Sequence, residues 1–237
     1  MVNDIASARG IVALDVATLE DALALVATLG SAVQRYKVGL ELFTAEGPVA
    51  VAALNEAGKS VFLDLKLHDI PNTVGRAAKA AGELGADILT VHAAGGRAMI
   101  EAAAQAAPRA RVVAVTALTS LDPRHLPAHI RTDRPLGEWV LDLTEEALAG
   151  GAAGVVLSGA EVAPVKKRFG ADCLCVVPGV RPAGSAHHDQ ARAATPADAL
   201  AAGADYLVIG RAVTLDADPL AAWTQLWSDV SLQEGRR

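Results

Sequence analysis

Aromatic side chains are scarce in this 237-residue chain, and it has no excess of positive charge. Phe, Trp and Tyr together make up 3% of the residues, too few for the base-stacking surface of a protein that binds single-stranded nucleic acid. The net charge is −6, whereas a general binder of nucleic acid or of an anionic membrane surface is basic. These absences argue against nucleic acid and membranes as partners.

Cysteines and long apolar runs are scarce as well. Cys173 and Cys175 stand two residues apart in an apolar run, where a strand would hold them too far apart for an unstrained disulfide. This usage fits a reducing compartment, and residues 1–9 lack the basic and apolar regions of a secretory signal peptide. No uncharged apolar run reaches the roughly 18 residues of a membrane span. We therefore expect a cytoplasmic location.

Short apolar runs alternate with Ala- and Leu-rich stretches of helical spacing along the whole chain. Runs of this kind are typical of strands buried on both faces of a parallel sheet. We expect such strands at Ile11–Val16, Tyr36–Leu40, Ser60–Leu65, Ile88–His92, Arg111–Leu118, Gly154–Leu157, Cys173–Val177 and Tyr206–Ile209. Eight strand–helix units in this length predict a (β/α)₈ TIM barrel, with residues 1–237 as a single domain. A doubly wound sheet is the alternative.

Charged residues gather at the ends of these runs, where a barrel carries its functional site. Asp64, Lys66 and Asp69 follow the third run, and Lys37 lies in the second. Asp64 and Lys66 are two residues apart, so we expect them on one face of a strand. Charges at an apolar strand end are costly unless they are paired. The four side chains therefore form either a structural ion-pair network or a catalytic site.

Carboxylate neighbours point to the chemistry of Lys66. They favour the charged ammonium form of a lysine. That form suits proton donation and the stabilisation of negative charge, whereas a Schiff-base mechanism needs the neutral amine. The cluster therefore predicts electrostatic stabilisation of a carbanion rather than a Schiff-base reaction.

A second polar group follows the last two runs. Gly210 and Arg211 end the eighth run, and Arg181 and Gln190 lie in the loop after the seventh. Arginine can bind phosphate through two hydrogen bonds, and glycine lets the backbone approach a ligand closely. Barrels often hold phosphate at these two loops. The sequence therefore predicts a phosphate site built from these residues.

The segment LDLKLHDIPNTV (63–74) closely resembles the motif of the orotidine 5′-phosphate decarboxylase family. Further stretches agree in order and spacing, namely ALD (13–15), KVG (37–39), ELF (41–43), VHAAGG (91–96), PGVR (178–181), DQ (189–190) and IGR (209–211). The resemblance runs from about residue 10 to about residue 225. It implies a homodimeric barrel that converts orotidine 5′-monophosphate (OMP) to UMP and CO₂ in pyrimidine biosynthesis, with no metal or other cofactor.

The resemblance also implies roles for the charged residues. Lys66 matches the donor of a proton to C6 of the pyrimidine, and Asp64 matches the carboxylate that lies against the carboxylate of the substrate. Lys37 matches the lysine that ties this aspartate to the ribose. Asp69 matches a residue that enters the site of the neighbouring subunit.

The remaining implied residues are substrate contacts. Ile70 and Thr73 lie beside Asp69 in the motif and are expected to accompany it. Asp15 matches a ligand of a ribose hydroxyl, and Thr119 matches a contact of the pyrimidine.

Two other functions stay open at this point. One is a Mg²⁺-dependent relative on the same barrel, either a sugar-phosphate decarboxylase or a hexulose-phosphate synthase, which shares only the Asp-x-Lys-x-x-Asp pattern. The other is a non-catalytic barrel that binds a phosphorylated ligand as a sensor or scaffold. The complete IPNT extension at 70–73 argues against the Mg²⁺-dependent relatives. The presence of Lys37, Asp64, Lys66 and Asp69 together argues against the non-catalytic barrel.

Overall fold

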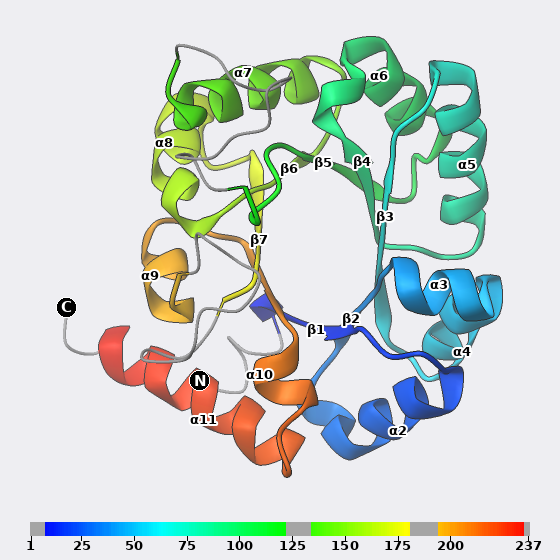
Figure 1. Cartoon of the computed structure of the whole chain (residues 1–237), viewed down its shortest axis with the longest axis vertical. Helices are drawn as coiled ribbons and strands as arrows, with labels where there is room; N and C mark the ends of the chain where they lie inside the picture. Colours follow the sequence, from blue (N-terminus) through cyan, green and yellow to red (C-terminus); the bar gives the residue numbers. More distant parts are fainter. Residues whose placement is uncertain (1–7, 122–133, 181–193, 235–237) are drawn as a thin grey trace.

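Eight parallel strands, each paired with the next in sequence, close into a barrel in which β8 pairs with β1 (Figure 1). The computed structural model describes residues 8–121, 134–180 and 194–234. The strands are β1 Gly10–Leu14, β2 Arg35–Val38, β3 Ser60–Leu67, β4 Ile88–His92, β5 Arg111–Val115, β6 Gly154–Val156, β7 Leu174–Pro178 and β8 Tyr206–Ile209. The predicted (β/α)₈ barrel is therefore confirmed.

Helices surround this barrel on its outside (Figure 1). They are α2 Leu19–Leu29, α3 Leu40–Glu46, α4 Pro48–Glu56, α5 Pro71–Glu83, α6 Arg97–Ala106, α7 Leu136–Ala149, α8 Gly159–Phe169, α9 Pro196–Ala201, α10 Arg211–Thr214 and α11 Pro219–Glu234, with short 3₁₀ turns at Gly30–Ala32 and Ala93–Gly95. Among the helices of the described ranges, none is long and apolar enough to cross a membrane.

Strand residues alternate between two separate apolar layers. Ile11 and Ala13 of β1 point into the barrel, where they belong to a small interior cluster. Val12 and Leu14 of the same strand belong to the larger cluster between the strands and the helices. Both faces of each strand are buried in this arrangement, which explains why the strands are apolar at consecutive positions.

The expected strands match the observed ones except at their ends. β1 ends at Leu14 and β5 at Val115, two or three residues before the apolar runs do. β3 is longer than expected, because it continues to Leu67 instead of ending at Leu65. An apolar run marks burial rather than strand pairing. After β5, for example, Thr116 and Ala117 are still buried although they belong to the following loop.

Close packing of β6 against β7 yields a stability prediction. A Cβ atom on Gly154 would lie 2.6 Å from the Leu174 Cα and closer still to its peptide oxygen. These are backbone atoms of a paired strand, so they cannot move aside. We expect Gly154→Ala to lower the free energy of unfolding by about 3 kcal/mol, as measured by urea denaturation.

A matched control is Gly137→Ala on α7, where an added Cβ meets no atom within 4 Å. Alanine is the better helix former, so this variant should gain up to about 1 kcal/mol. Equal effects of the two substitutions would contradict the predicted clash between β6 and β7.

Candidate active site

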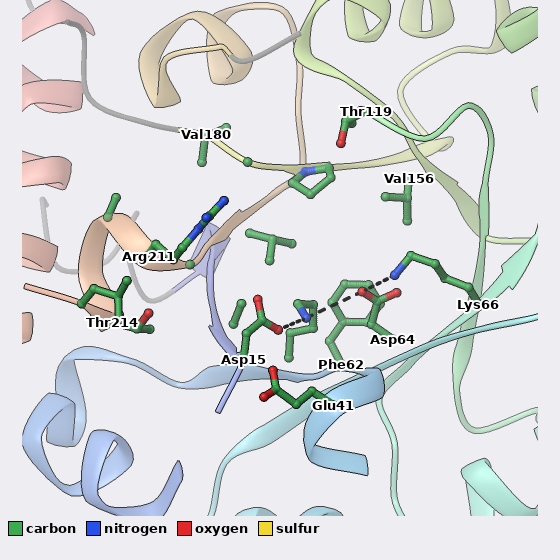
Figure 2. A pocket seen from close by; sticks show the side chains of 18 residues that line it. Asp15, Glu41, Phe62, Asp64, Lys66, Thr119, Val156, Val180, Arg211 and Thr214 are labelled. Carbon is green, nitrogen blue, oxygen red and sulfur yellow. Dashed lines mark hydrogen bonds and ion pairs between the residues drawn. The ribbon is translucent and has the colours of Figure 1, made fainter. Parts of the chain in front are cut away.

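A cavity of about 570 Å³ opens at the end of the barrel where the strands finish (Figure 2). Its floor is apolar and is formed by side chains of the barrel interior, namely Ala13, Phe62, Val156 and Val208. Its walls carry polar side chains from the strand ends and from the loops that follow them. A volume of this size fits a small organic ligand.

Four side chains of alternating charge run along one wall (Figure 2). The Lys37 Nζ lies 2.8 Å from an Asp15 carboxylate oxygen and 3.8 Å from the Asp64 Oδ2. The Lys66 Nζ lies 2.8 Å from the same Asp64 Oδ2. Asp64 and Lys37 keep only 12% and 11% of their side chains exposed. Because each charge is next to an opposite one, the cost of removing these two from water is largely offset.

A glycine makes room for the ammonium group of Lys37. Gly39 follows β2, and a Cβ at this position would lie 2.7 Å from the Lys37 Nζ and 3.2 Å from the Asp15 Oδ1. Any larger residue would therefore displace the centre of the charged chain. This is a local reason for the KVG sequence at 37–39.

The strand that carries Asp64 and Lys66 is irregular where they lie. β3 pairs with β4 at Leu63↔Leu89 and again at Leu67↔Val91, so three residues of β3 face a single residue of β4. Lys66 has a φ of +50°, in the left-handed region that costs a non-glycine residue about 1–3 kcal/mol. Among the described residues it is the only non-glycine with a positive φ. Our expectation of a regular strand is therefore wrong here, although both side chains do reach the cavity.

Thr90 is the β4 residue opposite this bulge. Its side chain is fully buried. The Thr90 hydroxyl donates to the Asp64 Oδ1 at 3.0 Å and accepts from the Lys66 backbone N–H at 2.8 Å. One side chain that does not itself line the cavity therefore contacts both charged residues.

The other predicted site residues are divided between the cavity and its surroundings. Thr119, Gly210 and Arg211 line the cavity together with Asp15, Lys37, Asp64 and Lys66.

Asp69, Ile70 and Thr73 do not line the cavity, because the polypeptide leaves the barrel after Leu67 and turns into α5. Asp69 and Ile70 are exposed at this turn, and an Asp69 oxygen accepts a hydrogen bond from the Ile70 N–H. Two further predicted residues, Arg181 and Gln190, lie outside the described residues.

Sequence reasoning assigned no role to three residues of this region. Glu41 adds a third carboxylate to the cavity from the first turn of α3, and Phe62 forms part of the floor. Thr90 is buried and does not line the cavity. Its signal in the sequence was a single hydroxyl inside the apolar run 88–91. Glu41 belongs to the matching stretch ELF (41–43), which by itself assigns it no role, and Phe62 looks like an ordinary core position.

Two histidines stack beside the charged chain. The rings of His68 and His92 lie 5.2 Å apart between centroids and are inclined by 23°. The His92 Nδ1 is buried, with no hydrogen-bond partner among the described residues. Burial lowers the pKa of His92 below its ordinary value of 6.5, and the nearby charges of His68 and Lys66 lower it further. His92 is therefore neutral at pH 7.

Fold and site together define a class of protein: a (β/α)₈ barrel with a polar, charge-lined cavity at the C-terminal ends of its strands, which is where enzymes of this fold place their active sites. Residues 9–226 match the model of the Orotidine 5'-phosphate decarboxylase / HUMPS family. The chain belongs to this family.

Individual relatives agree with the family match. The chain is 48% identical over 225 residues to a protein of Cutibacterium acnes named orotidine 5'-phosphate decarboxylase, covering 93% of this chain and 95% of the relative. It is 52% identical over 217 residues to a protein of the same name from Anaeromyxobacter sp. strain K, covering 91% and 95%. The crystal structure of orotidine 5'-phosphate decarboxylase from Lactobacillus acidophilus superposes with a TM-score of 0.82 at 37% identity, covering 94% of this chain and 99% of that one.

The lowered pKa of His92 predicts how stability depends on pH. Below pH 6.5 the unfolded chain binds a proton at this residue that the folded chain does not, so the free energy of unfolding falls as the pH falls. We expect His92→Gln to reduce the loss of stability between pH 7.5 and about pH 5, as measured by urea denaturation at a series of pH values. Identical pH dependence in the variant and the wild type would contradict the assignment.

Proposed function

We propose that this chain catalyses the decarboxylation of OMP to UMP and CO₂. The observation that carries the proposal is the alternating chain Asp15–Lys37–Asp64–Lys66 on the wall of the barrel cavity. Supporting it, relatives about half identical to this chain over most of their length are named orotidine 5'-phosphate decarboxylase. A purely structural network would not need to place its charges against an open cavity.

Electrostatics explain why the reaction needs this arrangement. When CO₂ leaves C6, the electron pair of the broken bond stays in the plane of the pyrimidine ring, where the ring π system delocalises it poorly. Fixed charges in a cavity with restricted water must therefore stabilise the carbanion. Lys66 supplies that positive charge and then transfers an Nζ proton to C6. Asp64, beside it, faces the substrate carboxylate and favours its departure, which we take as the smaller contribution.

Binding of the rest of the substrate is proposed for the other walls. Gly210 and Arg211 bind the phosphate, together with Arg181 and Gln190. Asp15 binds a ribose hydroxyl and Lys37 links it to Asp64, while Thr119 contacts the pyrimidine. In support, Gly210, Arg211 and Thr119 line the same cavity as the charged chain. The binding energy of the phosphate would then help to hold the pyrimidine C6 and its carboxylate against Asp64 and Lys66.

The proposal includes a homodimer in which Asp69 enters the site of the second subunit, with Ile70 and Thr73 beside it. Ile70 is 65% exposed, although it is a large apolar residue next to the charged motif. Its exposure supports a surface that a second copy of the chain would cover. A single catalytic domain in the cytoplasm completes the proposal, and the two free, buried thiols Cys173 and Cys175 fit a reducing compartment.

The reaction is tested by following the loss of OMP absorbance in EDTA. We expect the wild type to form UMP, and Lys66→Ala to lower kcat at least about 100-fold, because it removes both the stabilising charge and the proton donor. Lys79→Ala is the matched control, since Lys79 is an exposed lysine of α5 paired only with Glu83 in the described structure.

Other outcomes of this assay would redirect the assignment. Turnover of a sugar phosphate that requires added Mg²⁺ would favour the metal-dependent relatives. Tight binding of UMP by folded protein with no turnover of any of these substrates would favour a non-catalytic ligand-binding barrel.

Mixing two inactive variants tests the shared site. A heterodimer of Lys66→Ala and Asp69→Ala subunits contains one site with both groups intact. Random exchange of equal amounts makes half of the dimers mixed, so we expect about a quarter of the wild-type activity to return. No recovery, after subunit exchange has been verified by mass spectrometry, would contradict a site completed by Asp69 of the second subunit.

A further inference from the structure

We propose that Thr90 is a positioning residue, whose buried hydroxyl holds Asp64 and Lys66 in the arrangement that the reaction requires. This inference rests on the proposed function and adds to it a residue that does not line the cavity. Its chemical roles are to orient one carboxylate and to fix the backbone from which the Lys66 side chain extends.

The direction of both hydrogen bonds follows from the chemistry of the groups. A backbone N–H can only donate, so the Thr90 hydroxyl must accept from Lys66, at 2.8 Å. The single hydroxyl proton is then free to point at the Asp64 Oδ1, 3.0 Å away, which accepts it as an ionised carboxylate. Asp64 is therefore held at both oxygens, by Thr90 at Oδ1 and by the Lys66 ammonium at Oδ2, 2.8 Å away.

The bulge in β3 explains why a side chain performs this task. Between the paired residues Leu63 and Leu67, the β3 segment 64–66 faces Thr90 alone on β4. A regular ladder would give the Lys66 N–H a backbone carbonyl, whereas here it is directed to the Thr90 Oγ1. The left-handed backbone of Lys66, at a φ of +50°, is thereby tied to β4 at the residue whose side chain must reach the cavity.

Burial separates this role from direct catalysis. Thr90 has no exposed surface and does not line the cavity, so it cannot touch a bound ligand. It acts on the reacting end of the cavity alone, because its bonds go to Asp64 and Lys66 and not to the residues proposed to bind ribose or phosphate. Loss of its hydroxyl should therefore slow the chemical step and leave the binding of the nucleotide intact.

Thr90→Val is the direct test, because valine has nearly the same shape and no hydroxyl. We expect kcat to fall about 10- to 100-fold, since two hydrogen bonds that include one to a charged group are lost. The KM for OMP and the inhibition constant of UMP, which has no C6 carboxylate, should stay within about threefold. Thr90→Ser keeps the hydroxyl and should restore most of the wild-type kcat.

Thr144→Val is the matched control. Thr144 is also fully buried, but its hydroxyl donates to the Val140 carbonyl within α7, away from the cavity. Its replacement should leave kcat unchanged. A comparable loss of kcat in both valine variants would mean that any buried hydroxyl matters for folding, and it would overturn the proposal.

A second measurement is independent of catalysis. Hydrogen exchange of the peptide 64–68, followed by mass spectrometry, should be faster in Thr90→Val than in the wild type, because the Lys66 N–H loses its acceptor, and unchanged in Thr90→Ser. An unchanged rate in Thr90→Val would overturn the positioning role. If the wild type exchanged as expected but failed to decarboxylate OMP, the proposed function would fall while the tie between Thr90 and Lys66 would stand.

An unchanged kcat in Thr90→Val, or a UMP inhibition constant that weakens as much as kcat falls, would likewise overturn the inference. The first outcome would show that Asp64 and Lys66 keep their places without Thr90. The second would show that the substitution disturbs the whole cavity.

Discussion

The interaction on which this site depends is the alternation of charge along Asp15, Lys37, Asp64 and Lys66. Two of these side chains are nearly buried, and a lone buried charge would cost several kcal/mol. Each carboxylate here has an ammonium beside it, with separations of 2.8, 3.8 and 2.8 Å along the chain. The two inner members, Lys37 and Asp64, each have an opposite charge on both sides. Within this chain of charges, replacing Lys37 would leave Asp15 without a partner, and replacing Asp64 would leave Lys66 without one.

Several features of the backbone can be understood as requirements of this charge chain. Gly39 leaves space for the Lys37 ammonium, since a Cβ would lie 2.7 Å from it. The bulge in β3 brings Lys66 round to face Asp64, at the cost of a left-handed φ of +50°. Backbone strain of this kind persists only where its surroundings over-determine it. Around Lys66, these surroundings are the residues paired on either side of the bulge, Leu63 and Leu67, and the hydroxyl of Thr90.

The barrel supplies what the charges need around them. Its interior side chains form an apolar floor directly below the charged wall, so electrostatic interactions there are screened less than at an open surface. Its parallel strands all end at the same rim, so residues as distant in sequence as Asp15 and Arg211 line one cavity (Figure 2). A rigid wall and a low-dielectric floor are both consequences of strands that are buried on two faces.

The amino-acid sequence by itself determined the fold class and most of the charged site. Consecutive apolar residues revealed the eight strands, and a charged motif at strand ends identified Asp64, Lys66 and Lys37, because period and polarity are properties of the local sequence. Only the tertiary structure decided the bulge at Lys66, the role of Thr90 opposite it, and the entry of Glu41 into the cavity. These depend on which residues of different strands face one another, and strand register is set by packing across the barrel rather than by neighbours along the chain.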